Sequence, residues 1–340
     1  MKPLYGYLAG ANLGHWISQY GDKGKDHWDN YITESDIARM AEWGLDHVRV
    51  PVDYFLFERD EAPGVYDESH LLYIDNVLGW CRKHGMNMIL DLHHAPGFFF
   101  GNGAKNDLFT NRKSQERFLD IWRFFSKRYD SEGANLIFEL LNELVWQNAD
   151  PWNLLWQEAA EEIHRISPHR RIIVGGNNYN NVNELKNLVV SDDESIIYTF
   201  DFYEPFIFTH QRAGWMEHTR NYTKPVSFPF DPKEHTAYFG TLPADYKKRD
   251  IIDREYLAHY MFPVFDFVEK TGKTVYCGEY GVIANAAPDS AARWLSDMVD
   301  LMNAHGIGHA VWSYRGFSSI TSPDNRSFDK AMVDAISRKR

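Results

Sequence analysis

The strongest constraint on the fold is an alternation of short apolar runs with amphipathic helical segments along most of the 340 residues. Such an alternation is typical of a parallel α/β fold. The eight strand candidates are Gly6–Leu13, Asp46–Pro51, Asn87–His93, Asn135–Asn142, Ile172–Gly175, Ile196–Tyr203, Thr274–Glu279 and Ala310–Tyr314. The helix candidates are Glu34–Trp43, Leu71–His84, Gln115–Tyr129, Pro151–Ile166, Asn183–Val189, Glu255–Glu269, Asp289–His305 and Asp329–Ser337.

Eight such units predict a closed (β/α)8 barrel whose active site lies in the loops after the strands. An open doubly wound sheet is the alternative, but no G-x-G-x-x-G motif follows the first strand candidate, so its dinucleotide-binding version lacks support. Barrels of this kind routinely exceed 200 residues as one domain. We therefore predict a single catalytic barrel domain over residues 1–340.

Residues 204–254 interrupt the alternation, because they show no clear periodicity between the sixth strand candidate and the helix near Glu255. A connection of this length in a compact domain is usually functional or disordered. Its many aromatic residues, Trp215 and Tyr222 among them, argue against disorder. The segment is predicted to be an inserted lid or small subdomain over the active-site cleft.

The net charge of −12 argues against a nucleic-acid or anionic-membrane partner, because both need concentrated Lys and Arg. A neutral substrate is expected, bound by a monomer without cofactor or metal. The two cysteines, Cys81 and Cys277, lie in apolar segments and are expected to be buried free thiols. No signal peptide or membrane span is apparent, and the compartment stays open.

Polar and aromatic residues stand where the strand candidates end, which is where a barrel places its chemistry. They are Arg49, His93, His94, Asn142, Glu143, Asp201, Tyr203, Glu279 and Trp312.

Glu143 follows a hydrophobic strand, and partial desolvation there raises a carboxyl pKa, which suits a general acid. Its neighbour Asn142 can hydrogen-bond a sugar 2-hydroxyl. A helix-capping carboxylate is the alternative for Glu143. Glu139 lies deeper on the same strand candidate, where a buried ion pair is expected instead.

Glu279 ends Thr274–Glu279 between Gly278 and Gly281, which leave room around its carboxylate. A nucleophilic carboxylate must stay ionised, and Arg49 and Tyr203 are the expected hydrogen-bond donors to it. An ordinary interior ion pair is the alternative for Arg49.

His93 and His94 are adjacent, and strand alternation points adjacent side chains to opposite faces, so they are not expected to chelate one metal ion. One ring is expected to face the pocket near Glu143, and the other to pack outside the barrel. Trp312 is interpreted as the floor beneath the sugar, with core packing as the alternative.

These segments together resemble the ordered motifs of glycoside hydrolase family 5 over nearly the whole chain. The matching segments are Arg49-Val50-Pro51, Asp91-Leu92-His93-His94, Asn142-Glu143, Phe202-Tyr203, Gly278-Glu279-Tyr280-Gly281 and Val311-Trp312. Asn12-Leu13-Gly14, residues 175–180 and residues 208–211 look closest to the cellulase C type of endoglucanase.

The resemblance implies a retaining double displacement, with Glu143 as acid/base and Glu279 as nucleophile roughly 5–5.5 Å apart. It also implies supporting roles for Arg49, His93, Asn142 and Tyr203, and a platform for the −1 sugar at Trp312. One residue departs from the pattern, because the family carries a His where this chain has Asp201. Asp201 could pair with Arg49 or a His, bind a sugar hydroxyl, or weaken the enzyme by like-charge repulsion.

The expected function is cleavage of β-1,4-linked glucans by an endoglucanase, with mixed-linkage β-glucan as a further candidate substrate. An exo-acting β-glucosidase, a β-1,3-glucanase, a β-mannanase and a catalytically weakened carbohydrate-binding protein remain alternatives, because loops decide among them. Trp146, Trp152 and residues 98–100 are candidates for sugar subsites or for packing against the inserted segment. A metal-dependent hydrolase built on His93, Asp201 and Glu279 is a further alternative.

Overall fold

Eight parallel strands close into a barrel in the computed structural model, which describes residues 2–100, 106–240, 244–322 and 325–337. Each strand pairs with the next along the chain, and β1 pairs with β8, which closes the ring. The predicted (β/α)8 barrel is therefore confirmed. The strands are β1 Ala9–Asn12, β2 His47–Asp53, β3 Asn87–His94, β4 Leu136–Glu139, β5 Arg171–Gly175, β6 Ile196–Phe202, β7 Val275–Tyr280 and β8 Gly308–Val311.

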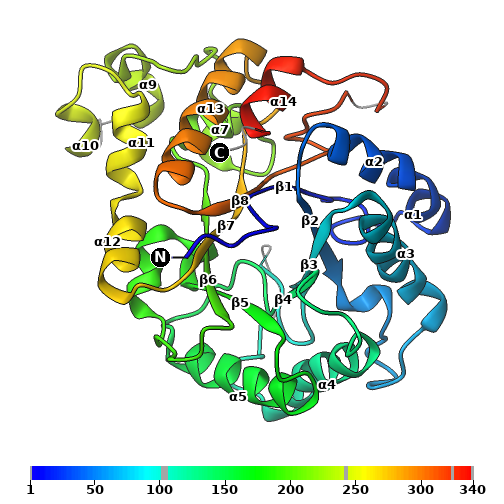
Figure 1. Cartoon of the computed structure of the whole chain (residues 1–340). Coiled ribbons are helices and arrows are strands. Elements are labelled where there is room, and N and C mark those ends of the chain that lie inside the picture. The colour runs from blue at the N-terminus through cyan, green and yellow to red at the C-terminus, as the bar shows by residue number, and fades with distance from the viewer. Residues whose placement is uncertain (1, 101–105, 241–243, 323–324, 338–340) are drawn as a thin grey trace.

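Helices surround the barrel in Figure 1. The long helices and the helices near the chain ends are α1 Lys25–Tyr31, α2 Glu34–Glu42, α3 Glu68–His84, α4 Arg112–Arg128, α5 Asp150–Ile166, α11 Arg254–Tyr260, α12 Phe262–Thr271, α13 Pro288–Ala304 and α14 Lys330–Ile336. Sequence signals explain their ends, since Asp67 caps α3 through the Ser69 amide and Gly85 ends it in a left-handed conformation. Within the described residues, none of the helices has the length and apolar character needed to cross a membrane.

Two helix predictions were wrong in detail. The segment expected as one helix, Glu255–Glu269, is two helices that meet at Met261, and Pro263 stands at the start of α12. Proline removes an amide donor and clashes with the preceding turn, so it favours a new helix start over a continuous helix. The segment expected as helix Asn183–Val189 is instead a 3-10 turn, Val182–Asn187.

The barrel interior is filled by side chains from alternate positions of the strands. One buried cluster includes Ile89, Ile137, Ile173 and Ile197 from four neighbouring strands, and Tyr7 from the segment before β1. The intervening strand positions pack against the helices in the larger outer core. Because alternation continues along each strand, the next inward positions toward the C-terminal ends carry the charged residues of the site.

Two irregularities in strand pairing change which side chains face the mouth of the barrel. Tyr276 faces the interior, and Cys277 and Tyr280 belong to the outer core, so both Gly278 and Glu279 must lie on the inner side. The register between β7 and its neighbours shifts at this point, as expected for a β-bulge. A second shift, between β2 and β3, pairs Asp53 with His94.

The segment after β6 forms short helical turns. They are α7 Phe206–Thr209, α8 Glu217–Arg220, the 3-10 turn Pro232–His235, α9 Thr236–Phe239 and α10 Ala244–Lys247. Figure 1 shows α9 and α10 beside α11 at the edge of the molecule, away from the centre of the barrel. The first part of the segment lies nearer the strand ends, where the Ile283 amide of the loop after β7 donates to the Thr209 carbonyl.

Candidate active site

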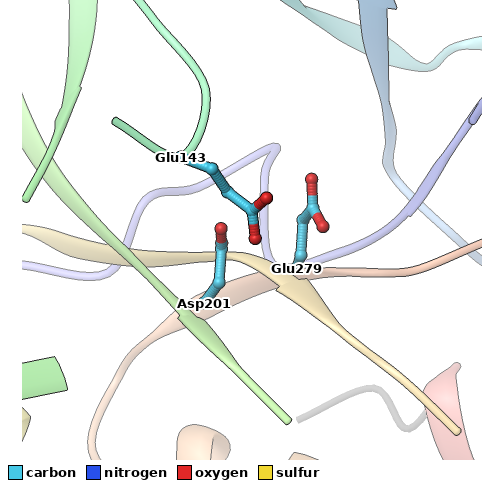
Figure 2. A group of neighbouring side chains, drawn as sticks. All are labelled: Glu143, Asp201 and Glu279. Atoms are coloured by element: carbon cyan, nitrogen blue, oxygen red, sulfur yellow. The ribbon is translucent and has the colours of Figure 1, made fainter. Parts of the chain in front are cut away.

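Three carboxyl groups meet at the C-terminal mouth of the barrel. Glu143, Asp201 and Glu279 each place a carboxylate oxygen within 4.8 Å of the others. Figure 2 shows them approaching from three directions, Asp201 from β6, Glu279 from β7 and Glu143 from the turn after β4. Asp201 and Glu279 are buried, and Glu143 is partly open to solvent. The sequence-predicted pair of glutamates is thus brought together.

Glu143 stands in a turn rather than at a strand end, because β4 stops at Glu139. Its backbone has a φ of 39°, in the left-handed region that non-glycine residues seldom adopt. This conformation ends the extended chain and directs the side chain toward β7. Burial, followed by repulsion from Glu279, raises the pKa of Glu143 well above its ordinary value.

Arg49 on β2 is the central cation of the site and is fully buried. Its Nε and Nη2 donate to the two carboxylate oxygens of Glu139 at 2.6 and 2.9 Å, a bidentate pair. Nη2 also lies 3.0 Å from Asp91 Oδ2, and Nη1 donates to Glu279 Oε1 at 3.0 Å. Glu139 therefore has the structural ion-pair role expected from its depth.

Glu279 receives donors on both carboxylate oxygens. Arg49 reaches Oε1, and the Tyr203 hydroxyl donates to Oε2 at 2.9 Å, so both nominated donors contact it. Burial raises the pKa of Glu279, while the positive charge of Arg49 and the Tyr203 hydrogen bond oppose this rise. The two glutamates are close enough to titrate together, and the hydrogen bonds from Arg49 and Tyr203 favour the ionised form of Glu279.

Asn142 is also buried, and only one end of its side-chain amide has a hydrogen-bond partner among the described residues. Its Oδ1 accepts a hydrogen bond from Arg49 Nη2 at 2.8 Å, which fixes the orientation of the amide. Its Nδ2 has no partner among the described residues. A buried donor left unpaired at an active site is expected to find its partner in a ligand.

Asp201 pairs with an amide rather than with a cation. The Nδ2 of Asn180 donates to Asp201 Oδ2 at 3.0 Å, and Oδ1 has no partner among the described residues. The expected alternative of a pair with Arg49 or a His is therefore wrong. Burial, followed by repulsion from Glu279 and Glu143, raises the pKa of Asp201 well above its ordinary value.

His93 and His94 both lie at the mouth, so the expectation that one ring packs outside the barrel was wrong. Their ring centroids are 5.5 Å apart, and both rings contact Phe100. The shifted pairing of His94 with Asp53 breaks the strict alternation on which that expectation rested. Burial lowers the pKa of His93 to about 3, so its ring is neutral and its Nδ1 donates to Asp91.

Aromatic rings line the neighbourhood of the three carboxyl groups. Trp312 stacks on His93 with 5.7 Å between ring centroids, and His15 contacts the edge of Trp312 at 5.8 Å. Trp146 is half-buried against Phe109. Trp152, a subsite candidate in the sequence, is instead fully buried and donates to a backbone carbonyl, so that hypothesis was wrong.

Three residues of the site were missed as contributors by sequence reasoning. Asn12 accepts from Arg49 and donates to backbone carbonyls of β7 and β8, Asp91 joins Arg49 to His93, and Asn180 holds Asp201. Their signal was present, since Asn12 stands one residue before the end of the first strand candidate and Asp91 lies shortly before the two histidines. Asn180 lies beyond the end of the fifth strand candidate, Ile172–Gly175, so the rule that searches strand ends did not find it.

A barrel with two carboxyl groups facing each other across its mouth, beside a buried arginine and aromatic rings, has the site of a glycoside hydrolase. The sequence matches the family described as Cellulase (glycosyl hydrolase family 5) over residues 12–318. The chain belongs to this family.

Among its relatives, Endoglucanase C of Acetivibrio thermocellus is 40% identical over 345 residues, covering 99% of this chain and all of that protein. Cellodextrinase A of Ruminococcus flavefaciens is 32% identical, covering 92% of this chain and 87% of that protein. A solved structure of Thermotoga maritima Cel5A in complex with cellobiose shares the fold with a TM-score of 0.80 at 22% identity, covering 99% of this chain and all of that one.

Proposed function

We propose that this protein is a retaining endo-β-1,4-glucanase that cleaves cellulose-type and mixed-linkage β-glucans, with Glu143 as acid/base and Glu279 as nucleophile. The observation that carries the proposal is the approach of the two carboxylates, whose oxygens lie within 4.8 Å of each other. Retaining glycosidases need carboxyl groups roughly 5–5.5 Å apart, whereas inverting enzymes keep them roughly 6.5–9.5 Å apart to admit a water molecule.

The reaction proceeds in two displacements. In the first, Glu279 attacks the anomeric carbon while Glu143 gives its proton to the glycosidic oxygen, which leaves as an alcohol. In the second, Glu143, now ionised, takes a proton from water, and the water oxygen displaces Glu279 from the sugar. The raised pKa of Glu143 keeps its proton available for the first step.

The surrounding residues support these steps. Arg49 and Tyr203 stabilise the ionised form of Glu279 through their hydrogen bonds. The free Nδ2 of Asn142 binds the 2-hydroxyl of the −1 sugar, a contact that strengthens as the oxocarbenium ion develops. Trp312, held by His93, supplies the apolar face beneath this sugar, and His94 and Trp146 border the cleft.

The substrate class follows from the relatives, two of which are named as an endoglucanase and a cellodextrinase. The net charge of −12 favours a neutral glycan over a polyanion. We further propose that the protein acts as a monomer and that the first part of residues 204–254, around Trp215, forms one wall of the cleft. Trp215 of this segment lies 5.7 Å from the ring of Phe317 in the loop after β8, which supports that placement.

Two measurements test the proposed function. A 2-fluoro glucoside with a good leaving group should add one sugar mass to the protein, and peptide mapping should place the adduct on Glu279. Product analysis on cellopentaose, mixed-linkage β-glucan, laminarin and mannan should give internal cleavage of the first two. Glu279→Gln is the blank, and Glu161→Gln, on the exposed face of α5, is the matched control.

Labelling at another residue, or none, would exclude the proposed mechanism. Release of single glucose units from chain ends would favour the exo-acting β-glucosidase. Selective cleavage of laminarin or mannan would favour a β-1,3-glucanase or β-mannanase on the same residues.

A further inference from the structure

The buried carboxyl cluster at the mouth of the barrel contains more carboxyl groups than its neighbours can pair with positive charge. Arg49 supplies the positive charge that acts on Glu143 and Asp201, but it is already paired with Asp91, Glu139 and Glu279. The nearby rings of His93 and His210 stay neutral, because burial lowers their pKa values to about 3 and about 4.

Asp201 adds a second, independent observation. The side chain is only 7% exposed, its Oδ2 accepts from Asn180, and its Oδ1 has no hydrogen-bond partner within the described residues. Figure 2 shows its carboxyl group directed at Glu143 and Glu279. A buried carboxyl oxygen without a hydrogen-bond partner is costly, and at a pH at which Asp201 is ionised a positively charged ligand is favoured there.

From this arrangement we infer that Glu143, Asp201 and Glu279 form a binding site for a hard divalent cation, Ca²⁺, which inhibits the enzyme by occupying the place of the sugar. Carboxylate oxygens are the ligands that such cations prefer. Ca²⁺–oxygen distances of 2.3–2.6 Å put two oxygens on opposite sides of an ion about 4.6–5.2 Å apart, and three oxygens spread evenly around it about 4.0–4.5 Å apart. Three oxygens within 4.8 Å of one another can therefore contact one ion together.

Ca²⁺ fits this site better than Mg²⁺. Ca²⁺ accepts irregular coordination by side-chain oxygens, whereas Mg²⁺ demands near-ideal octahedral geometry and gives up its water reluctantly. The site offers three protein ligands from three different elements, and the solvent-facing side at Glu143 leaves room for water as further ligands. An ion bound there would lie between the two glutamates that must flank the anomeric carbon, so binding of ion and substrate would exclude each other.

This inference rests on the proposed function only for its inhibitory consequence, and the binding is measured separately. Calorimetric titration of the metal-free protein with CaCl₂ at pH 8 should show one Ca²⁺ per chain. Initial rates on a soluble mixed-linkage glucan should show competitive inhibition, with a higher apparent KM and an unchanged kcat. MgCl₂ at the same concentrations is the ionic control and should inhibit at least about tenfold less strongly.

Substitutions assign the site. Asp201→Asn and Glu279→Gln should each weaken Ca²⁺ binding at least about tenfold, because affinity depends on the number of charged ligands. Asp22→Asn, a remote exposed carboxylate, should leave binding unchanged. Absence of stoichiometric Ca²⁺ binding, or equal binding by Asp201→Asn and the unmodified protein, would overturn the inference. If the unmodified protein does not bind Ca²⁺ but Glu279→Gln is inactive, only the inference of a Ca²⁺ site fails. If Glu279→Gln keeps its activity on glucan, the proposed function fails.

Discussion

Replacement of Arg49 by methionine tests the view that one buried cation holds the site together. Methionine has a similar length and no charge, so the change removes the pairs to Glu139, Asp91 and Glu279 while largely filling the space. All four side chains are buried, with relative exposures of 0 to 4%. The variant would therefore leave carboxyl groups inside the barrel without a counter-charge.

The magnitude follows from the burial of these groups. Removing one partner of a buried ion pair destabilises a protein by about 3–5 kcal/mol. For 340 residues, the unfolding entropy is about 0.7 kcal/mol per degree at roughly 2.1 cal/mol/K per residue. The expected fall in Tm is therefore about 4–7 °C near neutral pH. Activity should be lost as well, because Glu279 loses the cation that keeps it ionised.

The loss of stability should depend on pH. Burial raises the pKa values of Asp91 and Glu139 to about 7, above their ordinary values of about 4 in an unfolded chain. Between about pH 4 and pH 7 the folded state therefore binds more protons than the unfolded state, and the free energy of unfolding falls as the pH rises through this range. Without Arg49 these pKa values rise further, so the variant continues to lose stability above pH 7, and the Tm difference from the unmodified protein should widen between pH 7 and pH 8.

Thermal unfolding followed by circular dichroism at pH 5, 6, 7 and 8 measures this difference. Arg170→Met is a matched control, because Arg170 is also buried but, among the residues that the structure describes, donates only to backbone carbonyls, those of residues 129, 132, 133 and 136. Its Tm loss should stay nearly constant with pH. A Tm change below 1 °C for Arg49→Met, or one that does not vary with pH, would refute the reasoning.

Three further substitutions test the assigned roles. Glu143→Gln should lower kcat on glucan by about 10²–10⁴-fold. It should spare the glycosylation step of aryl glycosides with good leaving groups, because these need no proton from Glu143. Equal losses on both substrates would contradict the role of Glu143 as the acid. Tyr203→Phe removes a donor that lowers the pKa of Glu279, so the acid limb of the pH–kcat/KM profile should move to higher pH; an unmoved limb would argue against it. Asp201→His, which exchanges a buried acid for the residue of the family pattern, should raise kcat or shift the pH profile; a variant unchanged in both would show that Asp201 does not limit turnover.

The sequence alone was sufficient for the class of fold and for most of the residues that meet at the mouth of the barrel. Each of the eight strand candidates overlaps an observed strand, because parallel strands buried on both faces form continuous apolar runs in the sequence, although the predicted ends differ from the observed ends. The site residues could be found because a barrel brings its strand ends together, whatever their separation along the chain. Glu143, Glu279, Arg49 and Tyr203 were located by this rule, and they do meet.

The tertiary structure alone decided which way several site side chains point, because their directions depend on backbone irregularities and on packing between distant segments. Strict alternation from Tyr276 would turn Glu279 out of the barrel, and the bulge in β7 turns it inward. A similar shift in β3 brings His94 to the mouth, and the left-handed backbone of Glu143 aims its carboxyl group. Asn180 became the partner of Asp201 through the fold of the loop after β5. Periodicity reports which residues are apolar, but a single extra residue in a strand reverses the facing of every side chain beyond it, and the composition of the strand carries no mark of that change.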